Sequence, residues 1–148
     1  MNLVNEIKVV FPSQSCNESL ARICIASFVA KLDPAVSELA EIKTAVSEAV
    51  TNAIVHGYRN SYGKIELIAK AYDDKSIIIK IRDKGCGIPD IAQAMTPLFT
   101  TAPEEERAGL GFAVMESFMD KVSVKSYPGA GTTVTLRRKI TSCCEDPT

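Results

Sequence analysis

Hydrophobic and polar residues alternate along several short stretches of the chain, which is the pattern of half-buried β-strands. Two of these stretches are separated by Asp73, Asp74 and Lys75, a polar triplet that predicts a hairpin turn. Two later stretches are joined by the turn-forming sequence Pro-Gly-Ala-Gly. The predicted strands are residues 6–11, 64–72, 76–82, 122–126 and 132–137.

Three other stretches have apolar residues three or four positions apart, which predicts helices. The first covers residues 15–32. The second begins at Asp33 and Pro34, where Asp33 is the expected N-cap and Pro34 the first helical residue. Gly57 is a natural stop for this helix. The Gly-Leu-Gly sequence at residues 109–111 opens the third helix, which contains the apolar run FAVMESFM.

The order of these elements predicts an α+β fold. A strand and two helices are followed by two strands, an irregular segment at residues 90–108, a helix and two final strands. Hairpin strands with segregated helices indicate a mainly antiparallel sheet with helices on one face. We expect one domain over residues 1–140, because a chain of 148 residues suits one domain. Residues 141–148 are expected to form a disordered tail.

Composition narrows the class of partner. The formal net charge of −1 argues against a polyanion held by electrostatics, so we expect no direct nucleic-acid partner. Five cysteines without a CxxC pair, and a single histidine, do not match zinc-site spacing. No signal-peptide pattern is present, and no apolar run approaches the roughly 18 residues needed to span a membrane. We therefore expect a cytoplasmic protein with free thiols and no membrane partner.

A row of polar residues lies on the second predicted helix. Glu48, Asn52 and His56 stand four residues apart, so their side chains share one helix face. Such a row is usually a solvated face, and the alternative is the wall of a site. The amide oxygen of Asn52 would suit Mg²⁺, and Glu48 would suit the acceptance of a proton. His56, at the helix end, is expected to be structural or to lie at the rim.

Glycines cluster beside the predicted elements. Gly85 and Gly87 follow the predicted strand 76–82 and are preceded by the carboxylate of Asp83, and Gly131 precedes two threonines. Glycine lets a backbone approach a ligand closely or turn with positive φ, although each cluster alone is also compatible with an ordinary turn. The Gly-Leu-Gly sequence at residues 109–111 is expected to place free helix N–H groups where a phosphate can bind.

The motifs together form an ordered set: ExxxN on a helix, DxGxG after a strand, GxG at a helix start and GTT before a strand. This order resembles the Bergerat (GHKL) ATP-binding fold of DNA gyrase, MutL and sensor histidine kinases over residues 35–137. The resemblance implies a two-layer α/β sandwich with a mixed, mainly antiparallel sheet. It also implies an ATP site between the helices and the sheet, closed by a lid loop.

Longer segments are similar to one branch of this superfamily. NESLARICIASFVAKLDP, EIKTAVSEAVTNAIVHGY, IRDKGCGI and PLFTTAPEEERAGLGFAVMESFMD resemble the sporulation anti-sigma F factors, which are serine kinases. The resemblance covers residues 1–137. It implies a homodimer whose ATP-bound form holds a sigma F-like factor, and which phosphorylates a serine of an anti-anti-sigma factor. Arg22, beside Glu18 and Lys31 on the first helix, is a candidate partner contact.

The same resemblance assigns roles around ATP and Mg²⁺. Glu48 would be the catalytic base, Asn52 would hold the metal, and Asp83 would accept the adenine amino group. A carboxylate accepts but cannot donate, so Asp83 would select adenine over guanine. The ATP-binding residues implied are Asn52, Asp83, Gly85, Gly87, Thr100, Thr101, Arg107, Gly109, Leu110, Gly111 and Thr132. Thr132 is also compatible with simple strand packing.

The segment at residues 95–108 is broken by Pro97 and Pro103, and we expect it to be the lid. Arg107 ends this segment, and its planar cation would suit the γ-phosphate of ATP. The alternative is a surface ion pair with one of the glutamates at 104–106.

Two other functions remain open from the sequence. One is a sigma-sequestering module in which hydrolysis is incidental. The other is a stand-alone ATP-binding domain, related to sensor histidine kinases, that only binds a partner. His56 is the single histidine and lies on the ATP-motif helix, which disfavours a self-contained histidine kinase.

Overall fold

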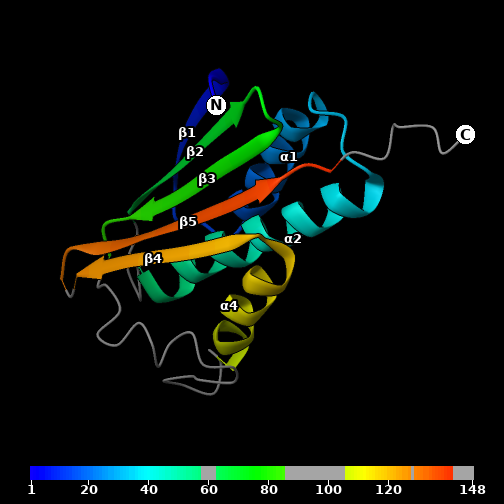
Figure 1. Cartoon of the computed structure of the whole chain (residues 1–148). Coiled ribbons are helices and arrows are strands. Elements are labelled where there is room, and N and C mark those ends of the chain that lie inside the picture. The colour runs from blue at the N-terminus through cyan, green and yellow to red at the C-terminus, as the bar shows by residue number, and fades with distance from the viewer. Residues whose placement is uncertain (58–62, 86–105, 128, 142–148) are drawn as a thin grey trace, which may run out of the picture.

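The computed structural model describes residues 1–57, 63–85, 106–127 and 129–141, and its elements are labelled in Figure 1. A turn of π-helix, η1, directly continues α2. The elements are β1 (Leu3–Pro12), α1 (Asn17–Ala30), α2 (Val36–Asn52), η1 (Ala53–Gly57), β2 (Lys64–Tyr72), β3 (Ser76–Asp83), α4 (Glu106–Phe118), β4 (Lys121–Tyr127) and β5 (Gly131–Lys139).

The strands form a five-stranded sheet in the order β1-β2-β3-β5-β4. All four neighbouring pairs are antiparallel, which confirms the predicted mainly antiparallel sheet. The α-helices of the described residues, α1, α2 and α4, cover one face of it, as Figure 1 shows. The predicted hairpin is also confirmed: the Lys75 N–H donates to the Tyr72 carbonyl at 3.0 Å, as in a turn, and Lys75 has a positive φ of 66°.

The core lies between the sheet and α2. Alternate residues of β2 and β3 point toward the helices and are buried, among them Leu67, Ile79 and Ile81. Ile42 and Val46 of α2, one helical turn apart, are buried against them. Each such side chain contributes roughly 1.5–3 kcal/mol on burial, so this layer fixes the position of α2.

The start of α2 differs from the prediction. Asp33 was expected to be the N-cap, but its φ of 59° is left-handed, and its N–H donates to the Ala30 carbonyl at the end of α1. An N-cap residue needs an extended conformation, which Ala35 has with φ −62° and ψ 153°. The Glu38 carboxylate accepts the Ala35 N–H at 3.1 Å and so caps the helix in place of an N-cap side chain.

The start of α4 also differs. The Gly-Leu-Gly sequence at residues 109–111 was expected to open this helix, but α4 begins at Glu106. A helix accepts internal glycines at a cost of about 1 kcal/mol each, and glutamate is favoured in a first turn. Arg107 is therefore a helical residue and does not end a loop. No helix within the described ranges is long and apolar enough to cross a membrane.

A buried charged cluster joins three elements at the far end of the sheet. Oε2 of Glu38 accepts the backbone N–H and the hydroxyl of Thr141, at 2.9 and 3.0 Å. The Arg138 guanidinium lies 3.7 Å from the same oxygen and donates to Glu41 and to the Phe118 carbonyl, both at 2.7 Å. The cluster thus ties the start of α2 to the end of α4 and to the chain after β5.

Burial alone would raise the pKa of Glu38. The hydrogen bonds from Thr141 and Ala35 and the nearby Arg138 cation outweigh it, so the pKa is lowered from its usual 4.5. A carboxyl with a depressed folded pKa stabilises the fold above its unfolded pKa. That contribution is lost as the pH falls through the folded pKa.

We expect Glu38→Gln to lower the free energy of unfolding at pH 7 by about 1–3 kcal/mol, because an amide NH₂ would face the Thr141 donors or Arg138. The deficit should shrink as the pH falls below 4.5. Urea titrations at several pH values measure both effects. Glu41→Gln is the control: its side chain is 37% exposed and should cost less. Equal losses, or a deficit independent of pH, would contradict the assignment.

Candidate functional site

Glu48 and Asn52 lie on the side of α2 that faces α4. A Cβ placed on Gly111 would come within 3.1 Å of Glu48 Oε2 and 3.4 Å of Asn52 Nδ2. Gly111 is buried at this crossing. The absence of a side chain at 111 therefore lets α4 approach the polar row closely.

The Asn52 amide carries an unused hydrogen-bonding group. Its Nδ2 is buried and has no hydrogen-bond partner among the described residues. An unpaired buried donor costs about 1–3 kcal/mol, so such a group is often completed by a ligand. The amide also offers an oxygen of the kind that Mg²⁺ prefers. A solvated face does not fit this geometry, and the polar row as the wall of a site stays a prediction.

The chain does not leave this region as a regular helix. Directly after Asn52 it forms the π-helical turn η1, which lies against β3 and β5. Single π-turns often occur at functional sites because they redirect a helix locally. His56 and Gly57 belong to this turn, and their side-chain surroundings lie outside the description.

Asp83 ends β3 in a buried position. Its side chain accepts the backbone N–H of Gly85 at 2.9 Å, and the backbone N–H of Thr132 is a second donor. Burial raises the pKa of this carboxyl, and the two N–H groups oppose the rise. The site therefore holds an oriented acceptor that is shielded from water.

Thr132 stands opposite Asp83 in the pairing of β3 with β5. Its hydroxyl is 2.8 Å from the Ser126 hydroxyl on β4, and the residue is buried. Gly131, just before it, has a φ of 109°, and a Cβ there would lie 2.7 Å from the Lys84 Cα. Gly131 and Ser126 were not predicted as site residues. The GTT motif was the available signal for Gly131, and no sequence signal marked Ser126.

The pair Asp83 and Thr132 lies at the same end of the domain as the polar row of α2. Asp83 pairs with Ile65 at the start of β2, the strand to which η1 leads. Figure 1 shows the C-terminal end of α2, the end of β3 and the start of β5 together on the left of the view. A buried carboxylate and a polar helix face are thus the two parts of one candidate site.

The remaining predicted site residues divide into two groups. Gly87, Thr100 and Thr101, with the lid residues 95–105, lie outside the described residues. Arg107, Gly109 and Leu110 belong to the first turns of α4, and only their helical backbone is described. Arg107 as a contact to a γ-phosphate therefore stays a prediction.

Arg22, the candidate partner contact, lies on α1 next to α2. Its Nε is 3.3 Å from the Glu18 carboxylate, which also accepts the Ser47 hydroxyl of α2. The Arg22 side chain is 43% exposed, so it remains accessible from solvent.

Comparison with known proteins places this arrangement. Residues 11–138 match a model of the histidine kinase-like ATPase domain. The chain is 52% identical over 144 residues to a protein named anti-sigma F factor from Geobacillus stearothermophilus, covering 97% of both chains. It is 53% identical over 137 residues to the anti-sigma F factor of Bacillus subtilis (strain 168), covering 92% of this chain and 93% of that protein.

Solved structures agree on the fold. The RsbU and RsbW domains of Rv1364c from Mycobacterium tuberculosis match with a TM-score of 0.68 at 21% identity, over 93% of this chain and 33% of that one. A blue-light activated histidine kinase from Erythrobacter litoralis matches with a TM-score of 0.56 at 19% identity, over 80% of this chain and 40% of that one. Both likenesses concern the Bergerat fold alone.

We expect Gly131→Ala to lower the free energy of unfolding by more than about 2 kcal/mol. The added Cβ would clash with the backbone at Lys84, and the positive φ would also be strained. Gly129→Ala is the matched control: its φ is also positive, 79°, but no atom lies within 4 Å of the added Cβ. It should cost about 1 kcal/mol. Denaturant unfolding compares them, and equal losses would mean that backbone contact at Gly131 is unimportant.

Proposed function

The chain belongs to the anti-sigma F factors, within the histidine kinase-like ATPase domain family, and we propose that it acts as an ATP-dependent serine kinase. In this proposal the ATP-bound protein holds a sporulation sigma factor away from RNA polymerase. The same site phosphorylates a serine of an anti-anti-sigma protein. The observation that carries the proposal is the buried, unpartnered Nδ2 of Asn52, beside Glu48 and close to Gly111, which has no side chain.

Asp83 would bind the adenine end of ATP. Its carboxylate accepts hydrogen bonds only, and the adenine amino group donates them. The backbone N–H groups of Gly85 and Thr132 already orient the carboxylate, so little ordering is needed when the base arrives. The Thr132 hydroxyl, which is hydrogen-bonded to Ser126, lies on the next strand and would line the same adenine-binding region.

Asn52 would bind the phosphate end. Its amide oxygen would hold Mg²⁺, which when bound neutralises charge on the phosphates. An asparagine amide can present either its oxygen or its NH₂, so the unpartnered NH₂ of Asn52 would suit a phosphate oxygen and its oxygen would suit a metal. Gly111, which has no side chain, lets the α4 backbone lie close to this amide.

Glu48 would accept the proton of the attacking serine. The serine Oγ bonds to the γ-phosphorus as the bond from that phosphorus to the β,γ-bridging oxygen breaks. The hydroxyl proton passes to the Glu48 carboxylate, and ADP leaves. Glu48 lies one helical turn before Asn52, so the base and the phosphate-binding amide are held by one rigid element.

Two surfaces would serve protein partners. Arg22 is partly exposed and fixed by Glu18, which suits a contact to a sigma factor or an anti-anti-sigma factor. A homodimer is supported by the edge strand β1, where Leu3, Val4 and Val10 are exposed.

The experiment that tests the function is gel filtration of the protein mixed with a sporulation sigma factor. We expect co-elution in Mg²⁺ and ATP, and a weaker complex in ADP, because only ATP completes the phosphate end of the site. Adding the anti-anti-sigma protein with radiolabelled ATP should label that protein on serine. A complex that is equal in both nucleotides, with no labelled protein, would leave only a nucleotide-binding module.

We expect Glu48→Gln to retain ATP binding and to slow phosphorylation of the anti-anti-sigma protein by about 10²–10⁴-fold, because glutamine keeps the size of the side chain but cannot take a proton. Single-turnover transfer of labelled phosphate measures the rate. Glu116→Gln, an exposed change on α4, is the control and should leave the rate unchanged. Transfer at the wild-type rate by Glu48→Gln would assign the base elsewhere.

We expect Asp83→Asn to weaken ATP binding at pH 7 by about tenfold or more, since an NH₂ would replace an acceptor that faces N–H donors. The ionised carboxylate is the binding form, and its folded pKa is raised above 3.8. Wild-type affinity should therefore fall as the pH drops through that raised pKa, while the affinity of the variant should not follow it. Titration with a fluorescent ATP analogue measures both.

Asp120→Asn is the control for this change. Asp120 also accepts a backbone N–H, from Lys139 at 2.8 Å, but it lies at the opposite end of β5. Its substitution should leave nucleotide affinity unchanged. Equal weakening by the two variants would point to a general loss of structure.

A further inference from the structure

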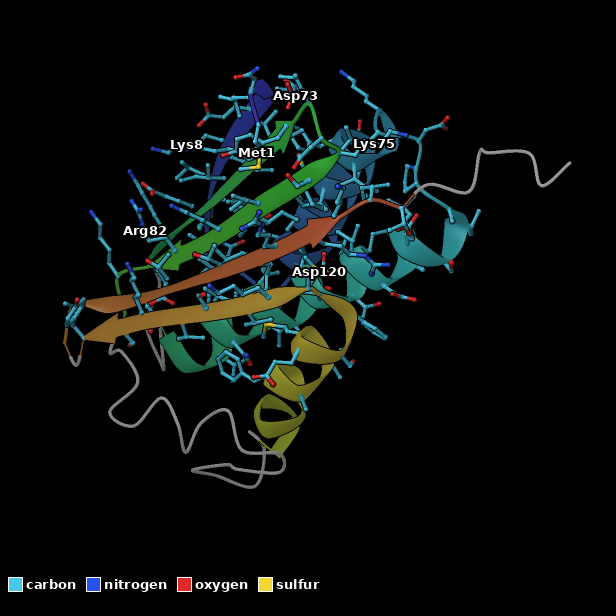
Figure 2. All side chains as sticks on the ribbon, in the orientation of Figure 1. Met1, Lys8, Asp73, Lys75, Arg82 and Asp120 are labelled. Atoms are coloured by element: carbon cyan, nitrogen blue, oxygen red, sulfur yellow. The ribbon has the colours of Figure 1, made fainter. Side chains whose placement is uncertain are left out.

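The sheet has a second face that no described helix covers. Figure 1 shows α1, α2 and α4 on one side, and Figure 2 shows the Lys8 and Arg82 side chains on the other. Residues directly opposite each other in an antiparallel sheet share a face. The pairing register therefore gives three rows across all five strands, running from Glu6 to Lys121, from Lys8 to Ser123 and from Val10 to Lys125. We call these rows the open face.

The open face is strongly basic. It holds seven of the seventeen basic residues of the chain and two of the eighteen acidic ones, Glu6 and Glu66. The rest of the chain therefore carries ten basic and sixteen acidic side chains. A net charge of −1 conceals a positive face on an otherwise acidic protein.

Most of this positive charge is not neutralised within the described part of the chain. Glu66 lies 3.7 Å from Lys8 and 3.5 Å from Arg82, so one carboxylate serves two cations. The other five basic residues of the open face form no ion pair with a described carboxylate. They are Lys70, Lys80, Lys121, Lys125 and Arg137.

Two of these cations are placed against each other. Lys121 and Arg137 are direct cross-strand partners on β4 and β5. Like charges directly opposite in a sheet are destabilising. A carboxylate bound between the two cations would remove the repulsion. The pair is therefore more favourable when an anion is bound than when it is free.

The centre of the open face is apolar. Ile68 and Ile78 lie on the neighbouring strands β2 and β3, half-buried, and each stands opposite a lysine: Ile68 opposite Lys80, and Ile78 opposite Lys70. An apolar centre with a charged rim is the usual anatomy of a protein-binding surface. No aromatic residue stands in the three rows, so their centre offers no platform for stacked bases; Tyr72 and Tyr127 continue the same face beyond the rows.

We propose that the open face docks an acidic segment of a partner protein, one in which carboxylates flank apolar residues. The apolar residues pack on Ile68 and Ile78, and the carboxylates pair with Lys70, Lys80 and Arg137. This surface lies on the side of the sheet away from Glu48, Asn52 and Gly111. Docking there is independent of the proposed nucleotide chemistry and compatible with it.

The test uses a fluorescein-labelled 20-residue peptide of glutamates with leucine at every fourth position. Its affinity for the full chain is measured by fluorescence anisotropy at rising salt. A second peptide replaces leucine with serine, and an oligothymidylate of equal charge is the third probe. We expect the leucine peptide to bind at least tenfold more tightly than either, with an affinity that falls as salt rises.

Lys80→Glu combined with Arg137→Glu should weaken the leucine peptide at least tenfold. The matched control, Lys31→Glu with Lys43→Glu, makes the same charge change on the helix side and should leave binding unchanged. Arg137→Glu also turns the like-charge pair with Lys121 into an opposite-charge pair, so the thermal midpoint should not fall. Lys80→Gln with Lys125→Gln gives a milder second variant should the first fail to fold.

Several outcomes overturn the proposal. If the leucine peptide does not bind the wild-type chain, the proposal is wrong. If the helix-side variant weakens binding as much as the open-face variant does, the peptide is held by diffuse electrostatic attraction and not by the open face. Equal binding of the serine peptide would remove the role of Ile68 and Ile78. Tighter binding of the oligothymidylate would make the surface a nucleic-acid site.

Discussion

The position of α2 is the constraint on which the rest of the structure depends. One side of the helix, with Ile42 and Val46, is buried against the sheet and leaves little freedom to rotate or slide. Its other side brings Glu48 and Asn52 to α4, and the contact is possible because position 111 has no side chain. The packing of the core therefore decides where the polar row points, and the candidate site lies where the two helices cross.

The buried cluster around Glu38 and Arg138 holds this arrangement from the opposite end of the helices. Arg138 donates to the carbonyl of Phe118, the last residue of α4, while Glu38 caps the first turn of α2. Both helices are thus anchored to β5 far from the candidate site. Since an unpaired buried charge is expensive, the cluster resists partial opening, and it fixes α4 at its C-terminal end while the middle of the helix, at Gly111, meets Asn52.

The sequence predicted those parts of the fold that depend on local pattern. The strand at residues 64–72 and the turn after it follow from alternating Ile, Leu and Ala and from a polar triplet. The start of α2 could not be predicted from local sequence. Asp33 has a left-handed conformation and is not the N-cap, and the Glu38 carboxylate that caps the helix is held by Thr141, which is 103 residues away in the chain. For the site, spacing placed Glu48 and Asn52 on one face. The burial of the Asn52 Nδ2 and the contact at Gly131 required tertiary structure.

The two faces of the sheet have separate chemistry but share the same strands. Along β3, Arg82 belongs to the open face and the next residue, Asp83, is buried on the helix side; along β5, Thr133 and Thr132 divide in the same way. A net charge near zero argues only against an electrostatic field of one sign over the whole surface. Here the basic side chains are concentrated on one face of the sheet, and the rest of the chain is acidic. Because Arg82 and Asp83 are adjacent in one strand but point to opposite faces, the open face and the buried carboxylate use separate sides of the same backbone segment.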